Sequence, residues 1–103
     1  MKDTIESITP AEARRRMDAG GWLVLDVREA AEYADGHIPG AVSAPLSRLE
    51  KRAEELAPCK AQPIILYCLS GRRSALAARL LARQGYTRLA DMGGIKNWPG
   101  PLV

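Results

Sequence analysis

The sequence predicts an α/β domain of three layers, in which helices cover both faces of a mostly parallel central sheet. Two short segments, Trp22–Val27 and Ile64–Cys68, are almost continuously apolar, which is typical of strands buried on both faces of a parallel sheet. Helical patterns alternate with these strands, and the connections are short. The length of 103 residues suits one core, so we expect residues 1–103 to form a single domain.

The first predicted helix begins at a capping box. Thr9 can accept a hydrogen bond at the helix start, Pro10 fits the first helical position, and Glu12 completes the box. The helix should extend to about Ala19 and end at the two glycines that follow.

The next segment predicts two strands with a short helix between them. The apolar segment Trp22–Val27 is the first strand, and Asp26 interrupts it near its end. A short helix follows at about Glu29–Ala34 and ends before Gly36. Ala41–Ala44 predicts a short strand, which Pro45 closes.

A second capping box, Ser47–Glu50, predicts the start of an amphipathic helix. Its apolar residues Leu49, Ala53 and Leu56 lie on one side of the helix. Pro58 should end it.

Ile64–Cys68 is the strongest strand in the sequence. It is followed by a loop, and Ser74 is expected to cap a helix that stops at Gly85. The last predicted elements are a short strand at Thr87–Ala90, a turn at Gly93-Gly94 and a helical half-turn around Ile95–Trp98.

The composition excludes several classes of protein. A hydrophobic content of 47% and a net charge of +3 argue against a disordered chain, and two cysteines do not make a disulfide framework. No apolar segment approaches the roughly 20 residues of a membrane span, so we expect no membrane partner. The first residues, Met1–Ser7, contain acids and no apolar stretch, so we expect no secretory signal.

Nucleic acid and metal are not expected ligands either. The 15 Lys and Arg residues barely outnumber 12 Asp and Glu, and only 5% of residues are aromatic, too few for a base-stacking surface. We interpret Arg14–Arg16 as a solvated helix face. With one histidine and no cysteine pair at ligand spacing, no metal or other cofactor is predicted.

Two polar residues lie at the ends of apolar strands, and their positions predict where the functional site is. Ligands of parallel α/β sheets bind at the carboxyl ends of the strands. Asp26 and Cys68 occupy such positions in the two strongest strands. We therefore expect the chemistry of the protein at these two residues.

The segment that begins at Cys68 favours an anion-binding loop. Gly71 permits a tight turn, successive N–H groups of such a turn converge, and the following helix adds its positive end. Arg72 and Arg73 add two positive charges. Because these features favour a thiolate, we interpret Cys68 as an activated nucleophile that faces a pocket for an anionic substrate.

Cys68 could have one of three roles. A free cysteine is commonly a buried structural residue. As a nucleophile, it could hydrolyse a phosphate ester, or it could accept a sulfane sulfur as a persulfide and pass it to a second thiophile. The length of the loop discriminates between the last two, and Arg73 lies five positions after Cys68, which gives Cys-x4-Arg.

Three blocks of the sequence resemble the single-domain rhodaneses, a family of sulfurtransferases. In order they span about Ile8 to Trp98, nearly the whole chain. The blocks are Leu25–Glu29 with Glu32-Tyr33 and Gly36–Ala41; Cys68–Ser74 with Ala77-Ala78, Leu80-Leu81 and Gly85-Tyr86; and Gly93–Ile95 with Trp98.

The resemblance implies a rhodanese-like fold, a catalytic Cys68 and an active loop of six residues, Cys68–Arg73. The related phosphatases and arsenate reductases have a longer loop, Cys-x5-Arg, preceded by His. Here Tyr67 precedes the cysteine and Ser74 stands at the sixth position after it, and both features favour sulfur transfer over phosphate chemistry.

The implied reaction moves sulfane sulfur from thiosulfate, or a similar small anionic donor, to cyanide or a thiol acceptor through a persulfide on Cys68. The alternative is a persulfide carrier that only protein donors and acceptors load and unload. Within the loop, Arg72 and Arg73 are assigned to the sulfonate of the donor, although one of them could instead pair with an acid. The remaining loop residues, expected to act mainly through backbone amides, are Leu69, Ser70, Gly71 and Ser74.

Asp26 and Arg28 are predicted to support the site from behind. Asp26 could anchor Arg28 or accept hydrogen bonds from the active loop, and Arg28 could be structural or face the substrate. Glu32 is expected to pair with a nearby arginine at the surface. His37, in a turn, should be structural rather than a general base.

Cys59 is expected at the end of the sheet opposite Cys68, because the strand of about five residues between them spans roughly 17 Å. A disulfide needs Cα atoms within about 7 Å, so no bridge is predicted. Tyr67 and Trp98 could line the pocket or pack in the core. A reactive thiol that must stay reduced favours a cytoplasmic location.

Overall fold

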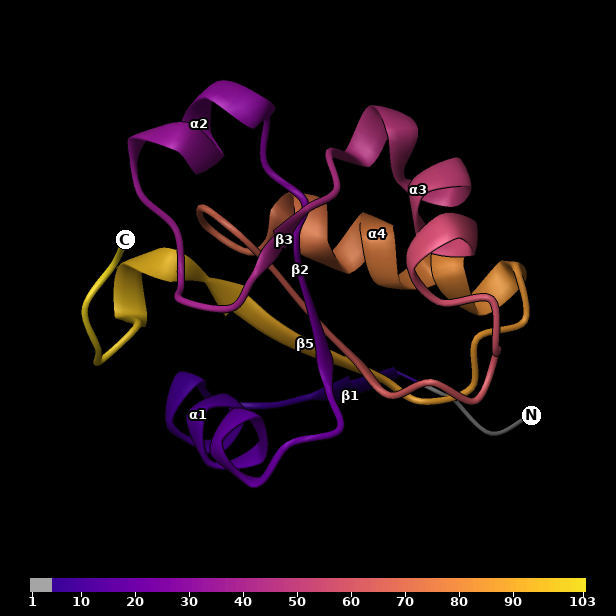
Figure 1. Cartoon of the computed structure of the whole chain (residues 1–103), viewed down its shortest axis with the longest axis horizontal. Coiled ribbons are helices and arrows are strands. Elements are labelled where there is room, and N and C mark those ends of the chain that lie inside the picture. The colour runs from indigo at the N-terminus through magenta and orange to yellow at the C-terminus, as the bar shows by residue number, and fades with distance from the viewer. Residues whose placement is uncertain (1–4) are drawn as a thin grey trace.

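The computed structural model describes residues 5–103 (Figure 1). Residues Met1–Thr4 lie outside the described residues. They are part of Met1–Ser7, the segment from which we expected no secretory signal. Along the chain the elements are β1 (Ile5–Ser7), α1 (Pro10–Ala19), β2 (Leu23–Asp26), α2 (Ala30–Asp35), β3 (Val42–Ser43), η1 (Leu46–Arg48), α3 (Leu49–Leu56), β4 (Ile64–Cys68), α4 (Arg72–Arg83), β5 (Leu89–Gly94) and η2 (Ile95–Asn97).

Five strands form one sheet in the order β1-β5-β4-β2-β3, and every pairing is parallel. The predicted α/β class is therefore confirmed, with the two apolar segments as the central strands β2 and β4. All five residues of β4 are buried. This burial explains why β4 is apolar without alternation, since neither face of it meets water.

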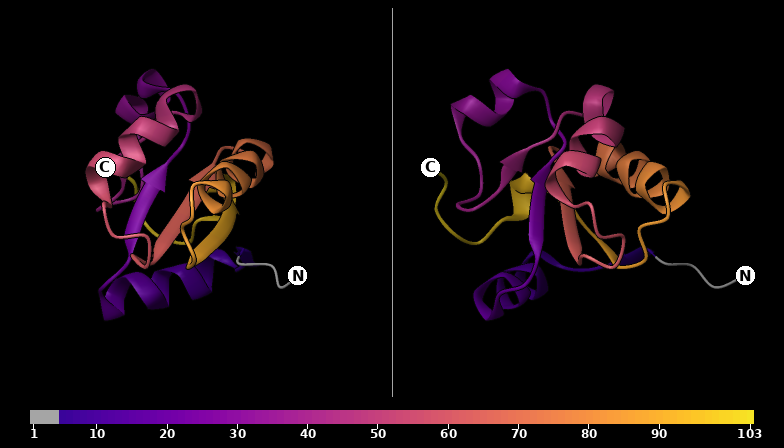
Figure 2. Two further views of the ribbon diagram at one scale, coloured as in Figure 1. Left: turned by 90° about the vertical axis from the view of Figure 1, so that its right-hand side faces the viewer. Right: turned by 45° about the vertical axis from the view of Figure 1, so that its right-hand side comes forward.

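Two buried clusters lie on opposite faces of the sheet. Residues of α3 and α4 contribute to the cluster that contains Leu66 and Cys68, and α1 contributes Ala13 to the cluster that contains Tyr67. Figure 2 shows α1 on the side of the sheet away from α4. Because side chains alternate along a strand, Tyr67 and Cys68 point to opposite faces.

The predicted start of α1 is confirmed in part. The Thr9 hydroxyl accepts a hydrogen bond from the N–H of Glu12 at 3.0 Å. The Glu12 carboxylate does not close the box but pairs with Arg15 and Arg16. Side chains one turn further along α1 have therefore replaced the backbone N–H of the cap residue as partners of Glu12.

Two predicted serine caps are wrong. The chain enters α3 through the 3-10 turn η1, so Ser47 lies inside that turn and Arg48 takes the cap position without a side-chain bond. In the second case α4 begins at Arg72 with Gly71 as its cap, so Ser74 lies within the first turn of the helix. Gly71 adopts a φ of 106°, which an L side chain rarely adopts, and this geometry lets the helix begin early.

The amino- and carboxyl-terminal strands differ most from the prediction. β1 was not expected at all, and it pairs with β5 at the edge of the sheet. β5 extends to Gly94, so the predicted turn at Gly93-Gly94 is wrong and these glycines end a strand beside β4.

In the described part of the chain, no helix is long and apolar enough to cross a bilayer.

Candidate active site

Cys68 is the last residue of β4, and its side chain is buried at the carboxyl end of the sheet. Only Leu69, Ser70 and Gly71 separate it from α4. Because Gly71 turns the chain sharply, the first turn of α4 comes back over the sulfur. The strand end and the helix start predicted from the sequence are thus brought together around one atom.

Polar groups of the loop surround the Cys68 sulfur. The backbone N–H of Gly71 donates to Sγ at 3.0 Å, and the Ser74 Oγ lies 3.6 Å from Sγ. In the thiol form Sγ donates to Ser74 Oγ, and the Ser74 hydroxyl donates to the Gly71 carbonyl at 3.2 Å, which ties the helix to the turn. When Cys68 is a thiolate, the Gly71 N–H and a Ser74 hydroxyl turned toward the sulfur stabilise its negative charge.

The pKa of the Cys68 thiol reflects two opposing effects. Burial alone raises this pKa, because it disfavours the charged thiolate. Hydrogen bonds from the Ser74 side chain and from the backbone of Ser74, Gly71 and Ser70 lower it, and they prevail, so the pKa lies below the ordinary value. The reactive thiolate is therefore more populated near neutral pH than in an ordinary cysteine.

We expect Ser74→Ala to move the acid limb of Cys68 reactivity to higher pH, because it removes a side-chain hydrogen bond that favours the thiolate. At pH 7 the thiol should react roughly tenfold more slowly, since a hydrogen bond to a charged group contributes about 1.5 kcal/mol. The measurement is the rate of iodoacetamide alkylation of Cys68 against pH.

Ser70→Ala is the matched control, because the exposed Ser70 acts on the sulfur only through its backbone. Its pH profile should coincide with that of the unmodified protein. Coincident profiles for Ser74→Ala and the unmodified protein would contradict the role of the hydroxyl.

Gly94 supports the active loop from the neighbouring strand, and sequence reasoning missed it. A Cβ at this position would lie 2.4 Å from the Leu69 carbonyl oxygen and 3.1 Å from the Ser70 Cα. Its φ of −97° is ordinary, so glycine is needed for space rather than for conformation. A glycine inside a strand is the available sequence signal of such a close approach.

The two arginines of the loop have different surroundings. Arg73 donates to both carboxylate oxygens of Glu32 on α2, at 2.7 and 3.1 Å. This bidentate pair lowers the pKa of Glu32 to about 2 and raises that of Arg73. Arg72 is exposed at the first position of α4, and no carboxylate among residues 5–103 pairs with it.

The expectation that Glu32 pairs with an arginine is thus confirmed, and its partner belongs to the loop itself. This is the alternative allowed for one of the two arginines. Arg73 joins α4 to α2 through Glu32, and which arginine contacts the donor stays a prediction.

Asp26 and Arg28 form a buried pair behind the strand ends. The Asp26 carboxylate accepts bonds from the Arg28 backbone N–H, Nε and Nη2 at 2.7–3.2 Å, and from the Tyr67 hydroxyl at 2.8 Å. Arg28 also donates to the Gly36 carbonyl. Two roles were considered for Asp26, and in the structure it anchors Arg28. Its other hydrogen-bond partner is Tyr67 and not the active loop.

Burial raises the pKa of Tyr67 above its ordinary value. Its hydroxyl therefore stays protonated and can donate to Asp26. Tyr67 packs in the cluster on the face opposite Cys68, and Trp98 packs against that cluster. Neither residue lines the surroundings of the sulfur.

The other singled-out residues lie away from the sulfur. His37 stacks on Tyr33 and its Nδ1 bonds the Tyr33 carbonyl, which fits the structural role expected for it. Cys59 is exposed before β4, at its amino end, and both cysteines are free. Among residues 5–103, no cluster of His, Cys, Asp or Glu could hold a metal ion.

A parallel sheet with a cysteine at the end of a central strand, followed by a tight loop whose N–H groups face the sulfur, places the chain among the α/β proteins with a cysteine-centred anion-binding loop. Within that class, residues 9–100 match the Rhodanese-like domain family, and the chain belongs to it.

Relatives of known name agree with this assignment. The chain is 39% identical over 99 residues to the putative sulfur carrier protein YrkF of Bacillus subtilis, covering 94% of this chain and 52% of YrkF. It is 34% identical over 79 residues to the thiosulfate sulfurtransferase PspE of Escherichia coli, covering 77% of this chain and 76% of PspE. The chain thus spans about half the length of YrkF.

Solved structures show the same fold. A rhodanese from E. coli aligns with a TM-score of 0.75 and 33% identity, covering 80% of this chain and 96% of that one. A thiosulfate sulfurtransferase from Pseudomonas aeruginosa aligns with a TM-score of 0.87 and 28% identity over 96% of this chain and 20% of its own. The rhodanese-like fold expected from the sequence is therefore confirmed.

Proposed function

We propose that this sulfurtransferase moves a sulfane sulfur from a small anionic donor of the thiosulfate type to a thiophilic acceptor, through a persulfide on Cys68. The observation that carries the proposal is the environment of the sulfur. A buried thiol with a lowered pKa lies under the Gly71 N–H and beside the Ser74 hydroxyl, and the positive charge of Arg73 interacts with it.

In the first half-reaction, the Cys68 thiolate attacks the outer sulfur of thiosulfate. A new S–S bond forms, the bond between the two sulfurs of thiosulfate breaks, and sulfite leaves with the electron pair. The negative charge then lies on the terminal sulfur of the persulfide. In this proposal the loop donors that face Cys68 Sγ, from Ser70 to Ser74, also stabilise that charge.

In the second half-reaction, a nucleophile attacks the terminal sulfur and the thiolate of Cys68 leaves. Cyanide yields thiocyanate, and a thiolate yields a new persulfide. No general base is needed, because both nucleophiles react as anions and Cys68 returns as a thiolate. Two half-reactions joined by a covalent intermediate imply ping-pong kinetics.

Arg72 and Arg73 have separate roles in this proposal. Arg72 binds the sulfonate of the donor, because its side chain is exposed at the loop and pairs with no carboxylate in residues 5–103. Arg73 holds the loop in place through Glu32 and adds positive charge beside the sulfur. Leu69, Ser70 and Gly71 contribute mainly backbone.

A second candidate is a sulfur carrier that exchanges sulfur only with protein partners. The name of YrkF, a putative sulfur carrier protein, favours it. The chemistry at Cys68 is identical in both cases, so only the donor and acceptor differ. For either function we propose the cytoplasm, where the free thiols of Cys68 and Cys59 stay reduced.

The proposal is tested by incubating the reduced protein with thiosulfate and measuring its intact mass. We expect a gain of one sulfur atom with release of one sulfite, and thiocyanate when cyanide is added. A protein that gains no sulfur from thiosulfate but gains it from a persulfidated protein donor is the carrier. A protein that gains none from either, yet hydrolyses a phosphate ester, would overturn the proposal.

A further inference from the structure

The outward face of α4 carries a row of arginines that begins at the active loop. Arg72, Leu76, Arg79 and Arg83 recur every three or four residues and are exposed, and we call these four residues the α4 stripe. The opposite side of the helix is buried and packs on the sheet. The α4 stripe therefore points away from the rest of the molecule.

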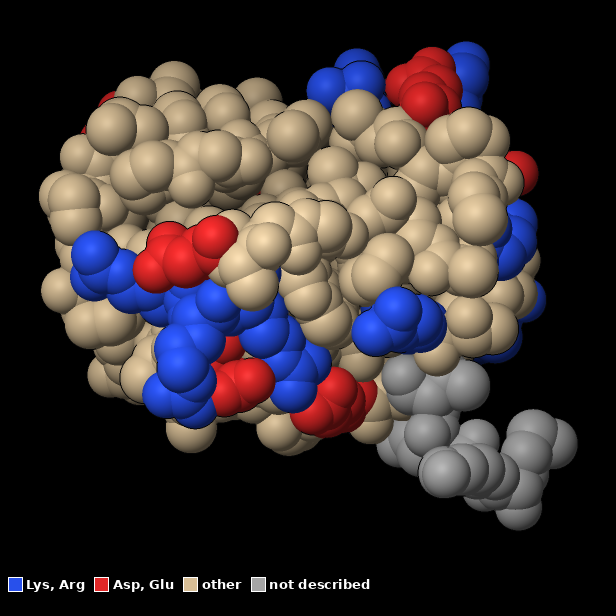
Figure 3. Space-filling view, turned by 60° about the horizontal axis from the view of Figure 1, so that its bottom comes forward, with Lys and Arg blue, Asp and Glu red and all other residues tan. Residues whose placement is uncertain are grey.

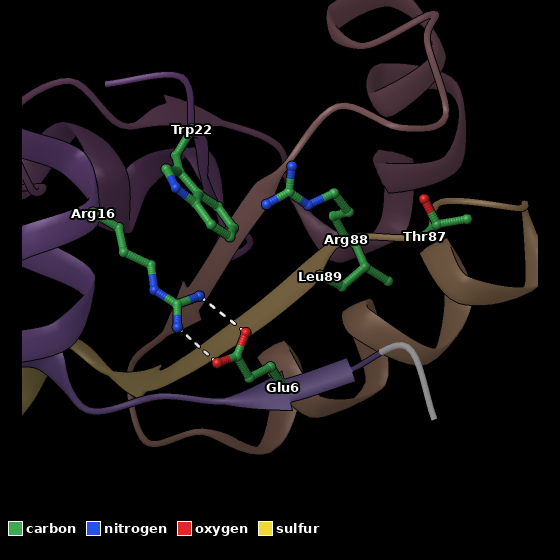
Figure 4. Close-up of a pocket in the computed structure, with 6 residues that line it drawn as sticks. All are labelled: Glu6, Arg16, Trp22, Thr87, Arg88 and Leu89. Carbon is green, nitrogen blue, oxygen red and sulfur yellow. Dashed lines mark hydrogen bonds and ion pairs between the residues drawn. The ribbon is translucent and has the colours of Figure 1, made fainter. Parts of the chain in front are cut away.

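Positive charge elsewhere is compensated only in part: within residues 5–103, Arg14, Arg48, Lys51, Arg88 and Lys96 have no carboxylate partner, whereas other cations are paired. Arg16 pairs with Glu6 and Glu12, and in Figure 4 the dashed lines mark its two bonds to Glu6. The face in Figure 3 shows acidic and basic side chains interspersed. The α4 stripe differs in that its three arginines follow one face of a single helix, and no carboxylate within residues 5–103 pairs with any of them.

The length of the α4 stripe excludes the small donor as its ligand. At about 1.5 Å of rise per residue, Arg79 lies roughly 10 Å and Arg83 roughly 16 Å from Arg72 along the helix axis. An anion the size of thiosulfate that binds at Arg72 cannot reach either residue. At physiological salt, where charges are screened beyond about 8 Å, Arg79 and Arg83 also contribute little attraction at the sulfur.

Leu76 gives the α4 stripe the character of a protein contact. Its side chain is 50% exposed between arginines, and Leu69 beside Cys68 is 39% exposed. An apolar contact flanked by several charges resembles a protein interface more than a surface that only keeps the chain soluble.

We propose that the α4 stripe docks an acidic segment of a protein thiol that exchanges sulfur with Cys68. This inference rests on the proposed persulfide chemistry and names the partner class for it. A segment that lies along α4 with its carboxylates on Arg79 and Arg83 brings its other end to Arg72 and the active loop. Its thiolate then attacks the terminal sulfur of the persulfide, the S–S bond breaks, and Cys68 leaves as a thiolate while the partner becomes the persulfide.

Two synthetic peptides test this. Each contains one cysteine, followed in the first by four glutamates and in the second by four glutamines. Protein loaded with thiosulfate should transfer sulfur to the acidic peptide roughly tenfold faster at low salt, and the advantage should disappear at high salt. Equal rates for the two peptides, with normal turnover of cyanide, would overturn the docking proposal and leave the sulfurtransferase intact.

Two double variants with the same change in net charge locate the effect. Arg79→Gln/Arg83→Gln should lose most of the preference for the acidic peptide while its cyanide turnover stays unchanged. Arg14→Gln/Arg88→Gln is the control, because Arg14 is on α1 and Arg88 lies beside Trp22 before β5 (Figure 4). If the control variant loses the preference for the acidic peptide to the same extent, the preference depends on net charge rather than on the α4 stripe, and the proposal is overturned.

A binding measurement keeps the α4 stripe testable without turnover. A fluorescent acidic peptide that lacks cysteine should bind the unloaded protein, as measured by anisotropy, and bind Arg79→Gln/Arg83→Gln less tightly. Failure of sulfur transfer together with this binding would overturn the persulfide chemistry alone. Tighter binding of a fluorescent DNA duplex at the same salt would assign the α4 stripe to nucleic acid instead.

Discussion

Cys68→Ser is expected to abolish sulfur transfer from thiosulfate, with a loss of roughly 10⁴-fold or more, as is usual when a covalent nucleophile is removed. A serine hydroxyl is not ionised near neutral pH and cannot form a persulfide. The hydrogen bonds that favour a thiolate at this position, from the loop and from Ser74, would then have no anion to stabilise. The measurement is thiocyanate formation from thiosulfate and cyanide.

Cys59→Ser is the control within the same chain. Cys59 is exposed and free, and it lies before the amino end of β4 while Cys68 ends that strand. We expect this variant to retain full turnover and to gain one sulfur atom from thiosulfate. Sulfur that is found on Cys59, or turnover that survives in Cys68→Ser, would remove Cys68 from its proposed role.

The sequence predicts the centre of this fold better than its edges. β2 and β4 are buried on both faces, and that burial leaves an apolar segment that is visible without any structure. β1 offers no such signal, because two of its three residues are exposed and it pairs only with β5. Its strand conformation depends on a partner more than 80 residues away, which local patterns do not report.

The candidate site shows the same division between local and distant information. A cysteine at a strand end, before a glycine and two arginines, predicts an anion-binding loop from neighbouring residues alone. Sequence cannot tell which arginine remains free, because Glu32 is 41 residues from Arg73. The serine caps failed for a related reason, since the positive φ of Gly71 starts α4 two residues before Ser74.

Removing one partner of the buried pair of Asp26 and Arg28 should destabilise the fold more than breaking any other ion pair in residues 5–103. We expect Asp26→Ala to lower the free energy of unfolding by about 3–5 kcal/mol, because it leaves the guanidinium of Arg28 buried without a counter-charge. The Tyr67 hydroxyl would lose its acceptor as well. Urea denaturation followed by circular dichroism measures the effect.

Two comparison variants separate the buried charge from other causes. Glu32→Ala breaks an arginine pair of similar geometry whose side chains are about 32% exposed, and we expect a loss of about 0.2–1 kcal/mol. Asp26→Leu/Arg28→Met removes both charges, so it should be more stable than Asp26→Ala. A double variant no more stable than the single one would mean that lost packing and hydrogen bonds, rather than an unpaired charge, cause the loss.

The Asp26→Ala variant also tests whether the pair of Asp26 and Arg28 affects the reactivity of Cys68. Asp26 contacts Tyr67 on the face of the sheet opposite Cys68, and its hydrogen bonds within residues 5–103 go to Arg28 and Tyr67 rather than to the active loop. At a temperature where Asp26→Ala is still folded, its alkylation rate at Cys68 should equal that of the unmodified protein. A slower rate in the folded variant would show that Asp26 positions the loop through Tyr67, as well as holding the fold together.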